Sequence, residues 1–111
     1  INGDGNHSRD FTYIDNVIEA NLKACLAPQK ACGKAYNIAF GENTSLNSLY
    51  QKLCQLLQKD IEPIYGLERV GDVKHSLADI SQAKIMIGYA PSYDLGSGLE
   101  RAIDWYKEYL A

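Results

Sequence analysis

Four segments of the sequence carry apolar residues at helical spacing, and this feature restricts the fold more than any other. An apolar face that recurs every three to four residues has to pack against a neighbouring element, so we expect four amphipathic helices in one small core. They cover residues 14–26, 45–57, 79–87 and 95–110.

Local signals mark the ends of these helices. Asp15 is expected to cap the first helix, Thr44 or Ser45 the second and Asp79 the third, because short polar side chains accept hydrogen bonds from free N–H groups at a helix start. Gly88 is expected to end the third helix, since glycine readily adopts the left-handed backbone conformation found just after a helix.

Three shorter runs favour β-strands, namely residues 10–14, 35–40 and 61–65. Pro63 interrupts the last run, which predicts an edge strand or a bend. The expected order is β-α-β-α-β-loop-α-α, a small α/β domain with a few short strands and about four helices. Such a narrow sheet leaves exposed edges that a neighbouring domain could cover.

A chain of 111 residues is enough for one domain, so residues 1–111 are expected to form a single unit. The first residue is Ile1, and the pattern opens at what looks like a strand end running into a turn, so we expect a fragment of a longer protein. The net charge of −3 argues against a nucleic-acid partner, and no apolar run approaches the ~20 residues of a membrane span.

The cysteines and histidines form no metal-ligand pattern. Cys25, Cys32 and Cys54 show no CxxC spacing, and we interpret them as reduced thiols of a cytoplasmic protein. His7 and His75 lie far apart in the sequence, and surface or packing roles are expected for both. No metal is therefore predicted.

Motif searches find no self-contained active site. The GxSxG, HExxH and P-loop patterns are absent. Gly3-Asp4-Gly5 is not a dinucleotide fingerprint, because no third glycine follows at the right spacing. Neither catalytic nor cofactor-binding residues are predicted in this chain.

Two arginines stand in unusual settings. Arg9 precedes a β-rich run, and Arg69 lies in a polar loop beside Gly71 and Asp72. The planar guanidinium suits bidentate contact with phosphate oxygens, so two of them could clamp a diphosphate. The alternative from the residues alone is that each arginine pairs with a neighbouring acid on the surface, which contributes only about 0–1 kcal/mol.

Four runs resemble one family. They are GDGNHSRDFTYIDNV, YNIAFG, RVGDVKHSLADISQA and IGYAPSYDLGSGLERAIDWY, in this order along nearly the whole chain. They resemble the C-terminal part of the nucleotide-sugar epimerase/dehydratase family, the extended short-chain dehydrogenases. Within this family, the motif sequences most resemble those of UDP-N-acetylglucosamine 4-epimerases of bacterial surface-polysaccharide pathways.

The resemblance implies roles for individual residues. Arg9 and Arg69 would contact the diphosphate of a UDP-sugar, and Asp72 would receive the ribose hydroxyls. Phe11, a tyrosine in many relatives, would line the nucleotide pocket. From its position beside Arg9, we expect Asp10 to fix the strand and the turn before it.

Ser76 lies four residues after Asp72, where the resemblance implies contact with the 2-substituent of the sugar. A tyrosine there is found in relatives restricted to glucose and galactose. A bulky ring against an acetamido group costs roughly 1–3 kcal/mol, as overpacking does. A serine leaves room, and the expected substrate is therefore a UDP-N-acetylhexosamine; the alternative is that Ser76 is an ordinary loop residue.

The resemblance also implies parts that this chain lacks. The family's NAD-binding Rossmann domain and its Tyr-x-x-x-Lys pair belong to the N-terminal half, and no tyrosine here has a lysine four residues later. The fragment alone is expected to bind no NAD and to be inactive. The full-length protein is expected to be a homodimeric, NAD-dependent 4-epimerase that interconverts UDP-GlcNAc and UDP-GalNAc.

Two alternatives remain open at this point. One is a UDP-glucose 4-epimerase or another nucleotide-sugar epimerase or dehydratase of the same family. The other, of a different class, is a non-enzymatic small α/β binding module, because the catalytic half is absent from the chain.

Overall fold

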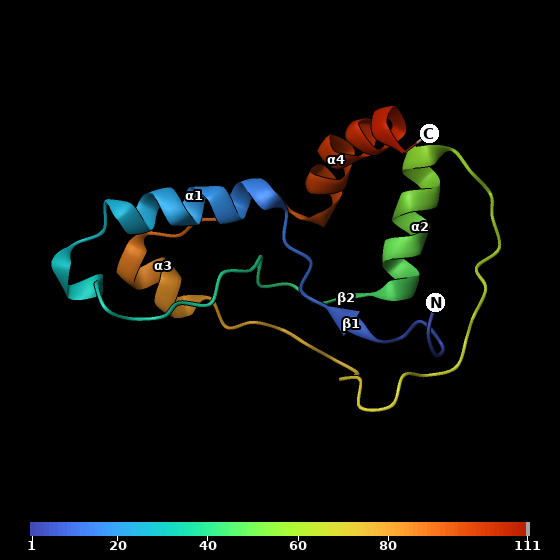
Figure 1. Cartoon of the computed structure of the whole chain (residues 1–111), viewed down its shortest axis with the longest axis horizontal. Helices are drawn as coiled ribbons and strands as arrows, with labels where there is room; N and C mark the ends of the chain where they lie inside the picture. Colours follow the sequence, from blue (N-terminus) through green and yellow to red (C-terminus); the bar gives the residue numbers. More distant parts are fainter. Residues whose placement is uncertain (111) are drawn as a thin grey trace.

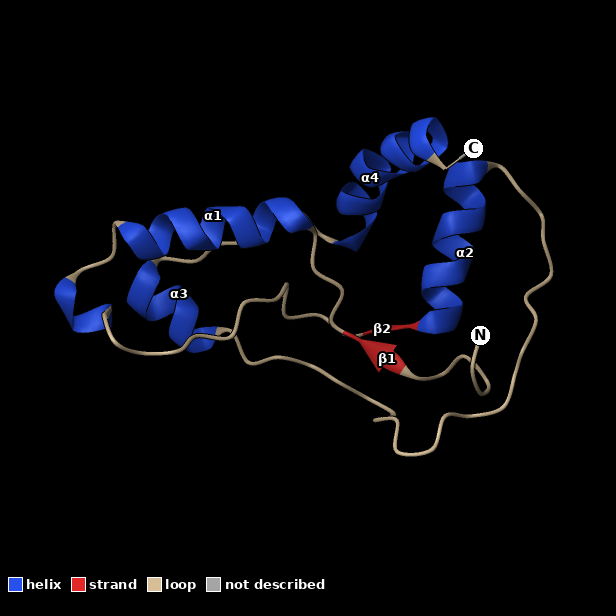
Figure 2. Cartoon of the chain, viewed as in Figure 1, coloured by secondary structure: helices blue, strands red, loops and turns tan. Residues whose placement is uncertain are grey.

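The computed structural model describes residues 1–110; Ala111, the last residue of the expected domain, lies outside the described residues. Four helices and a two-stranded sheet form the chain (Figures 1 and 2). In chain order the elements are β1 (Ser8–Arg9), α1 (Ile14–Cys25), a 3-10 helix (Gln29–Ala31), β2 (Thr44–Ser45), α2 (Leu46–Leu57), α3 (Ser81–Ile87) and α4 (Leu95–Tyr109). The expected class, a small α/β unit with four helices, is confirmed.

Most of the expected helix ends are confirmed. Ser45 caps α2 by accepting a hydrogen bond from the N–H of Ser48 at 3.1 Å. Gly88 ends α3 with a φ of 69°, in the left-handed region. Asp79 accepts from the N–H of Ser81 at 2.9 Å, although Ile80 holds the cap position itself. Asp15 as a cap is wrong, because it lies within the first turn of α1 and no side chain caps that helix.

The sheet is smaller than expected. β1 pairs antiparallel with β2, with Ser8 opposite Ser45 and Arg9 opposite Thr44. An isolated parallel bridge joins Ser8 to His75 on the other side of β1. The pairing therefore brings the N-terminal segment, the start of α2 and the loop before α3 together, although more than 60 residues separate Ser8 from His75 in the sequence.

The three expected strands are not formed, and this corrects the sequence prediction. Residues 10–13, 35–40 and 61–65 are extended or irregular and pair with no strand, and residue 14 already belongs to α1. Their β-rich composition fits a pleated half-buried surface, but a strand exists only where a neighbour supplies ladder hydrogen bonds. Around residue 40 that role falls to a side chain, because the N–H groups of Phe40 and Gly41 donate to Asp10.

The closed core lies between α1, α3 and the 3-10 helix. Small residues dominate it, so the two helices approach closely. The Tyr89 hydroxyl, buried in this core, donates to the carbonyl of Ala39 at 2.6 Å and ties the loop before β2 to the helices. The buried cluster consists of Ala20, Ala31, Ala39, Ile80, Ala83, Ile87 and Tyr89.

Helices α2 and α4 lie on the other side of the molecule from α1 and α3 (Figure 1). They line a cavity of about 760 Å³ that is open to solvent, here called the apolar cavity; its lining includes Leu49, Leu53, Leu57, Leu99, Ile103 and Tyr106. The radius of gyration is 16.6 Å, against about 13 Å for a compact domain of this length. No helix within residues 1–110 is long and apolar enough to cross a lipid bilayer.

Candidate functional site

Arg9, Arg69 and Asp72 line one cavity of about 300 Å³. Arg9 is on β1, whereas Arg69 and Asp72 belong to the long loop between α2 and α3. We call this concavity the arginine cavity; its other lining residues are Asn2, His7 and Leu46. Two guanidinium groups that are distant in the sequence therefore share one hollow of the surface.

Hydrogen bonds fix the direction of Arg9. Its Nη2 donates to Oδ1 of Asp72 at 2.6 Å, and its Nη1 donates to the carbonyl of Ser8 at 2.8 Å. A longer contact of 3.4 Å reaches the carbonyl of Lys74. The side chains of Arg9 and Asp72 are 31% and 32% exposed, so the pair is held in place and is still reachable from solvent.

A tight turn sets Arg69 and Asp72 side by side. The N–H of Asp72 donates to the carbonyl of Arg69 at 3.2 Å, which closes the turn. Gly71 adopts a φ of 80°, a conformation that favours glycine. Among residues 1–110, Arg69 makes no ion pair. Its positive charge is therefore free to attract an anion in the cavity.

His7 also lines the cavity, and the sequence analysis assigned it no binding role. It is buried, and its Nε2 lies 3.0 Å from Oε1 of Glu68, next to Arg69 in the chain. This contact joins the N-terminal turn to the loop that bears Arg69. The available signal was spacing: in extended backbone, residues two apart point to the same face, as do His7 and Arg9.

The turn before β1 is anchored on α2. The N–H of Asn47 donates to the carbonyl of Gly5 at 3.0 Å, and the N–H of Leu46 donates to the carbonyl of His7 at 3.0 Å. Gly5 has a φ of 78°, and a Cβ there would overlap the amide of Asn47. Within the turn, the backbone N–H and side-chain amide of Asn6 hold the pKa of Asp4 below its usual value.

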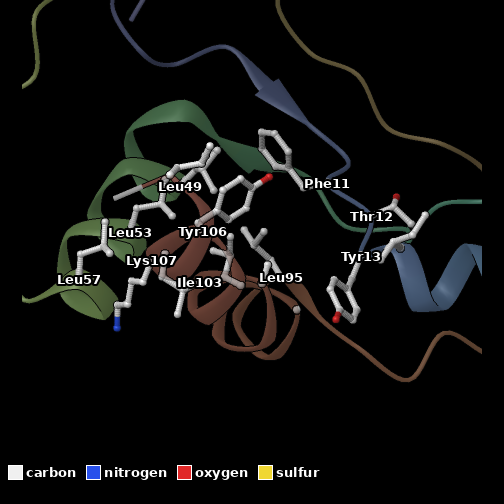
Figure 3. Close-up of a pocket in the computed structure, with 15 residues that line it drawn as sticks. Phe11, Thr12, Tyr13, Leu49, Leu53, Leu57, Leu95, Ile103, Tyr106 and Lys107 are labelled. Carbon is white, nitrogen blue, oxygen red and sulfur yellow. The ribbon is translucent and has the colours of Figure 1, made fainter.

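Phe11 and Ser76, two other expected site residues, do not line the arginine cavity. Phe11 lines the apolar cavity near Leu49, Leu53 and Tyr106 (Figure 3). Ser76 is exposed; its N–H donates to the carbonyl of Ser8 at 3.1 Å. The structure thus gathers Arg9, Arg69 and Asp72 and leaves Phe11 and Ser76 beside them.

Other chemistry finds little support in the part of the chain that the structure describes. No group of three or more His, Cys, Asp or Glu side chains there could hold a metal ion. The glycines of the N-terminal turn pack on α2 through Asn47 and lead into β1, so they do not form the strand–turn–helix cradle that a dinucleotide needs. The glycines therefore do not fit NAD. The arginine cavity fits an anion whose oxygens accept hydrogen bonds.

Comparison with known proteins also points to a protein that binds a nucleotide sugar. Residues 1–39 match the sequence model of the NAD dependent epimerase/dehydratase family. A UDP-glucuronate 4-epimerase of Thermodesulfobacterium geofontis is 36% identical over 97% of this chain and 33% of its own length.

Two solved structures have the same fold, and their sequences are about one third identical to this chain where they align. The UDP-glucose 4-epimerase of Thermotoga maritima, with UDP-glucose, superposes with a TM-score of 0.91 at 34% identity, over 100% of this chain and 35% of that one. The UDP-N-acetylglucosamine 4-epimerase of Methanobrevibacter ruminantium M1, in complex with UDP-N-acetylmuramic acid, gives 0.85 at 33% identity, over 97% and 34%.

The chain spans about a third of the length of the proteins it matches. These proteins are named for three different sugars and are similarly identical to this chain, so similarity alone does not select one substrate. What these proteins have in common is a nucleotide sugar and epimerisation at carbon 4. The comparisons therefore support the nucleotide-sugar 4-epimerase family for this chain.

Proposed function

We propose that this chain is the C-terminal UDP-sugar-binding part of an NAD-dependent nucleotide-sugar 4-epimerase. The observation that carries the proposal is the arginine cavity, which Arg9, Arg69 and Asp72 line together. Asp72 forms an ion pair with Arg9 there. Arginine side chains bind phosphate oxygens through strong, often bidentate, hydrogen bonds, so two of them in one cavity suit a diphosphate.

The charges allow a division of roles within the cavity. Arg69 makes no ion pair among the described residues, so a phosphate oxygen would be its first partner. The guanidinium of Arg9 has five N–H donors, more than its three contacts use. Asp72 accepts from Arg9 and keeps lone pairs for ribose hydroxyls. The same ion pair would then orient both groups before the nucleotide arrives.

For the sugar, we propose a UDP-N-acetylhexosamine, so that the full-length enzyme would interconvert UDP-GlcNAc and UDP-GalNAc. Ser76 supports this substrate, because its small, exposed side chain leaves room for an acetamido group. The relatives named for glucose and glucuronate favour the alternative, a UDP-glucose or UDP-glucuronate 4-epimerase.

The remaining machinery is proposed for other parts of a longer protein. The family name supports NAD, which would bind an N-terminal Rossmann domain that also supplies the tyrosine and lysine of catalysis. This chain alone would hold the UDP end and would be inactive. The side chains that line the apolar cavity, such as Leu53 and Tyr106, would pack on that domain. The full-length enzyme would be a homodimer of the cytoplasm, a location that three free cysteines support.

An assay of the full-length protein tests the proposed substrate. We expect 4-epimerase activity with UDP-GlcNAc, and we expect Ser76→Tyr to lower kcat/KM for UDP-GlcNAc about 10-fold or more while UDP-glucose turnover changes little. Ser92→Tyr, which adds the same ring to an exposed loop before α4, is the matched control. Equal losses with both sugars would contradict the role of Ser76, and no epimerase activity with any UDP-sugar would contradict the proposed function.

A further inference from the structure

Asp10, the neighbour of Arg9, receives an unusual set of hydrogen bonds. Its Oδ1 accepts from the N–H of Phe40 at 3.1 Å, and its Oδ2 accepts from the N–H of Gly41 at 3.0 Å and of Ala78 at 3.4 Å. No cation pairs with this carboxylate within residues 1–110. Backbone N–H groups from two distant segments compensate its charge instead.

The contacts of Asp10 complete a series along the loop that carries the site. Arg9 holds the side chain of Asp72 and contacts the carbonyl of Lys74, which also accepts from the N–H of Ser8 at 2.8 Å. The carbonyl of Ser8 accepts from Ser76 at 3.1 Å, and Asp10 accepts from Ala78. Every second residue from 72 to 78 is thus tied to residues 8–10.

We propose that Asp10 is a positioning residue for the diphosphate site. By holding the 40–41 loop on one side and Ala78 on the other, its carboxylate fixes the register between Arg9 and the loop that presents Arg69 and Asp72. Asp10 itself does not line the arginine cavity. It therefore acts through Arg9 and Asp72. As a statement about UDP binding, this inference rests on the proposed function.

The chemistry requires a carboxylate at this position. Both oxygens accept from backbone N–H groups, and Gly41 lies within reach of each of them, at 3.2 Å and 3.0 Å. An asparagine has the same shape but offers one acceptor oxygen, and its NH₂ group would face at least one N–H donor. Asp10→Asn therefore replaces an attractive contact with a donor–donor conflict while the side-chain volume is kept.

The chain offers a matched control in Asn16. This residue is fully buried and ties α1 to the loop before α4: its Nδ2 donates to the carbonyl of Tyr93 at 2.7 Å, and its Oδ1 accepts from the N–H groups of Ser92 and Tyr93. Asn16→Asp makes the converse isosteric change, and it removes a donor at a residue that does not line the arginine cavity. Both substitutions cost stability, but only the one at Asp10 lies next to the site.

The test measures UDP affinity by calorimetry in the full-length protein. We expect Asp10→Asn to weaken UDP binding about 10-fold or more and Asn16→Asp to leave it within about twofold, as the loss of one charge-assisted contact predicts. In an Arg9→Ala background, Asp10→Asn should weaken binding by much less than in the wild type, since residues that act through one another are not additive. An equal loss in both backgrounds would overturn the proposal.

Amide hydrogen exchange in the ligand-free protein separates this inference from the proposed function. Asp10→Asn should speed exchange at Asp72 and Ser76, whereas Asn16→Asp should not. If the wild type bound no UDP, the proposed function would fail, and the exchange data would still decide the role of Asp10. Unchanged exchange across residues 72–78 in Asp10→Asn would overturn that role, whatever the affinity for UDP.

Discussion

The α1–α3 core and the arginine cavity are built in opposite ways. The core consists of four alanines, two isoleucines and Tyr89, all of them buried. The cavity is made of partly exposed charged side chains that hydrogen bonds hold in place. Substitutions in the core should therefore lower the free energy of unfolding without changing ligand affinity, whereas substitutions in or beside the cavity should change ligand affinity as well.

The largest effect on stability is expected from Ile87→Ala in the core. Ile87 is buried against the alanines of α1 and α3, and its truncation leaves a cavity that costs about 2–5 kcal/mol of unfolding free energy. Urea denaturation measures the loss. Ile85→Ala is the control on the same helix: its side chain is 74% exposed, and the cost should stay within about 0.5 kcal/mol.

A smaller loss, with a separate effect on binding, is expected from Gly71→Ala. A Cβ at Gly71 meets nothing within 4 Å, so the cost of about 1–2 kcal/mol comes from its φ of 80° alone. Because Gly71 lies in the turn between Arg69 and Asp72, the substitution should also weaken UDP binding. Calorimetry with UDP measures this second effect.

Gly33 provides the comparison for that experiment. It has a φ of 71° and equally open space, but it lies next to the 3-10 helix and the core. Gly33→Ala should cost similar stability without changing the affinity for UDP. If both alanine variants bound UDP equally well, the turn at Gly71 would have no part in the site.

Ser45→Ala should cost about 1 kcal/mol of unfolding free energy, because it removes the side chain that caps α2. Ser45 also pairs with Ser8 in the sheet, but through the backbone, which the substitution preserves. Thermal denaturation checks the expected loss. A melting temperature equal to that of the wild type would show that α2 does not need this cap.

The smallest expected effect is a pH dependence of the unfolding free energy, and it comes from Tyr89 in the core. Burial raises the pKa of the Tyr89 phenol above its ordinary value of about 10, and the carboxylates of Asp10 and Glu19 act in the same direction. The neutral phenol is therefore favoured in the folded state. Its contribution to stability is complete below about pH 10 and is lost as the pH rises through the folded-state pKa.

Tyr89→Phe serves as the control for this titration. The variant also loses the hydrogen bond to Ala39, so it should be less stable at neutral pH. Above about pH 10, the ordinary pKa of the phenol, its unfolding free energy should fall less than that of the wild type. Parallel curves for the two proteins would show that Tyr89 does not titrate with folding.

The helices could be predicted from the sequence because their signals are local. Apolar spacing and the polar residue at Ser45 act within a few positions, and both are found as expected. The strands at residues 35–40 and 61–65 could not be judged in this way, since a strand needs a partner that composition does not name. Asp94 was missed as the cap of α4, although it accepts from the N–H of Ser97 at 2.8 Å.

Only part of the candidate site could be predicted from the sequence: Arg9, Arg69 and Asp72 line the arginine cavity as expected, whereas Phe11 and Ser76 do not. The resemblance pointed to Arg9 and Arg69, and nothing in the 59 residues between them tells whether they line one cavity. Arg9 donates to Asp72, and Asp10 accepts hydrogen bonds from the N–H groups of Gly41 and Ala78. These contacts join residues that are 31 to 68 positions apart in the sequence. Only the folded chain shows such long-range contacts.

The most direct test of the arginine cavity compares UDP with uridine in the full-length protein. Calorimetry with Arg9→Ala, Arg69→Ala and the double variant should show UDP binding weakened about 10-fold or more by each single change, because each removes charge-assisted hydrogen bonds to the diphosphate. Uridine, which has no phosphate, should lose much less affinity than UDP in each variant; a small loss is expected with Arg9→Ala, because Arg9 also orients Asp72 toward the ribose hydroxyls. Full UDP affinity in either single variant, or an equal loss for uridine, would contradict the claim that both arginines hold the diphosphate.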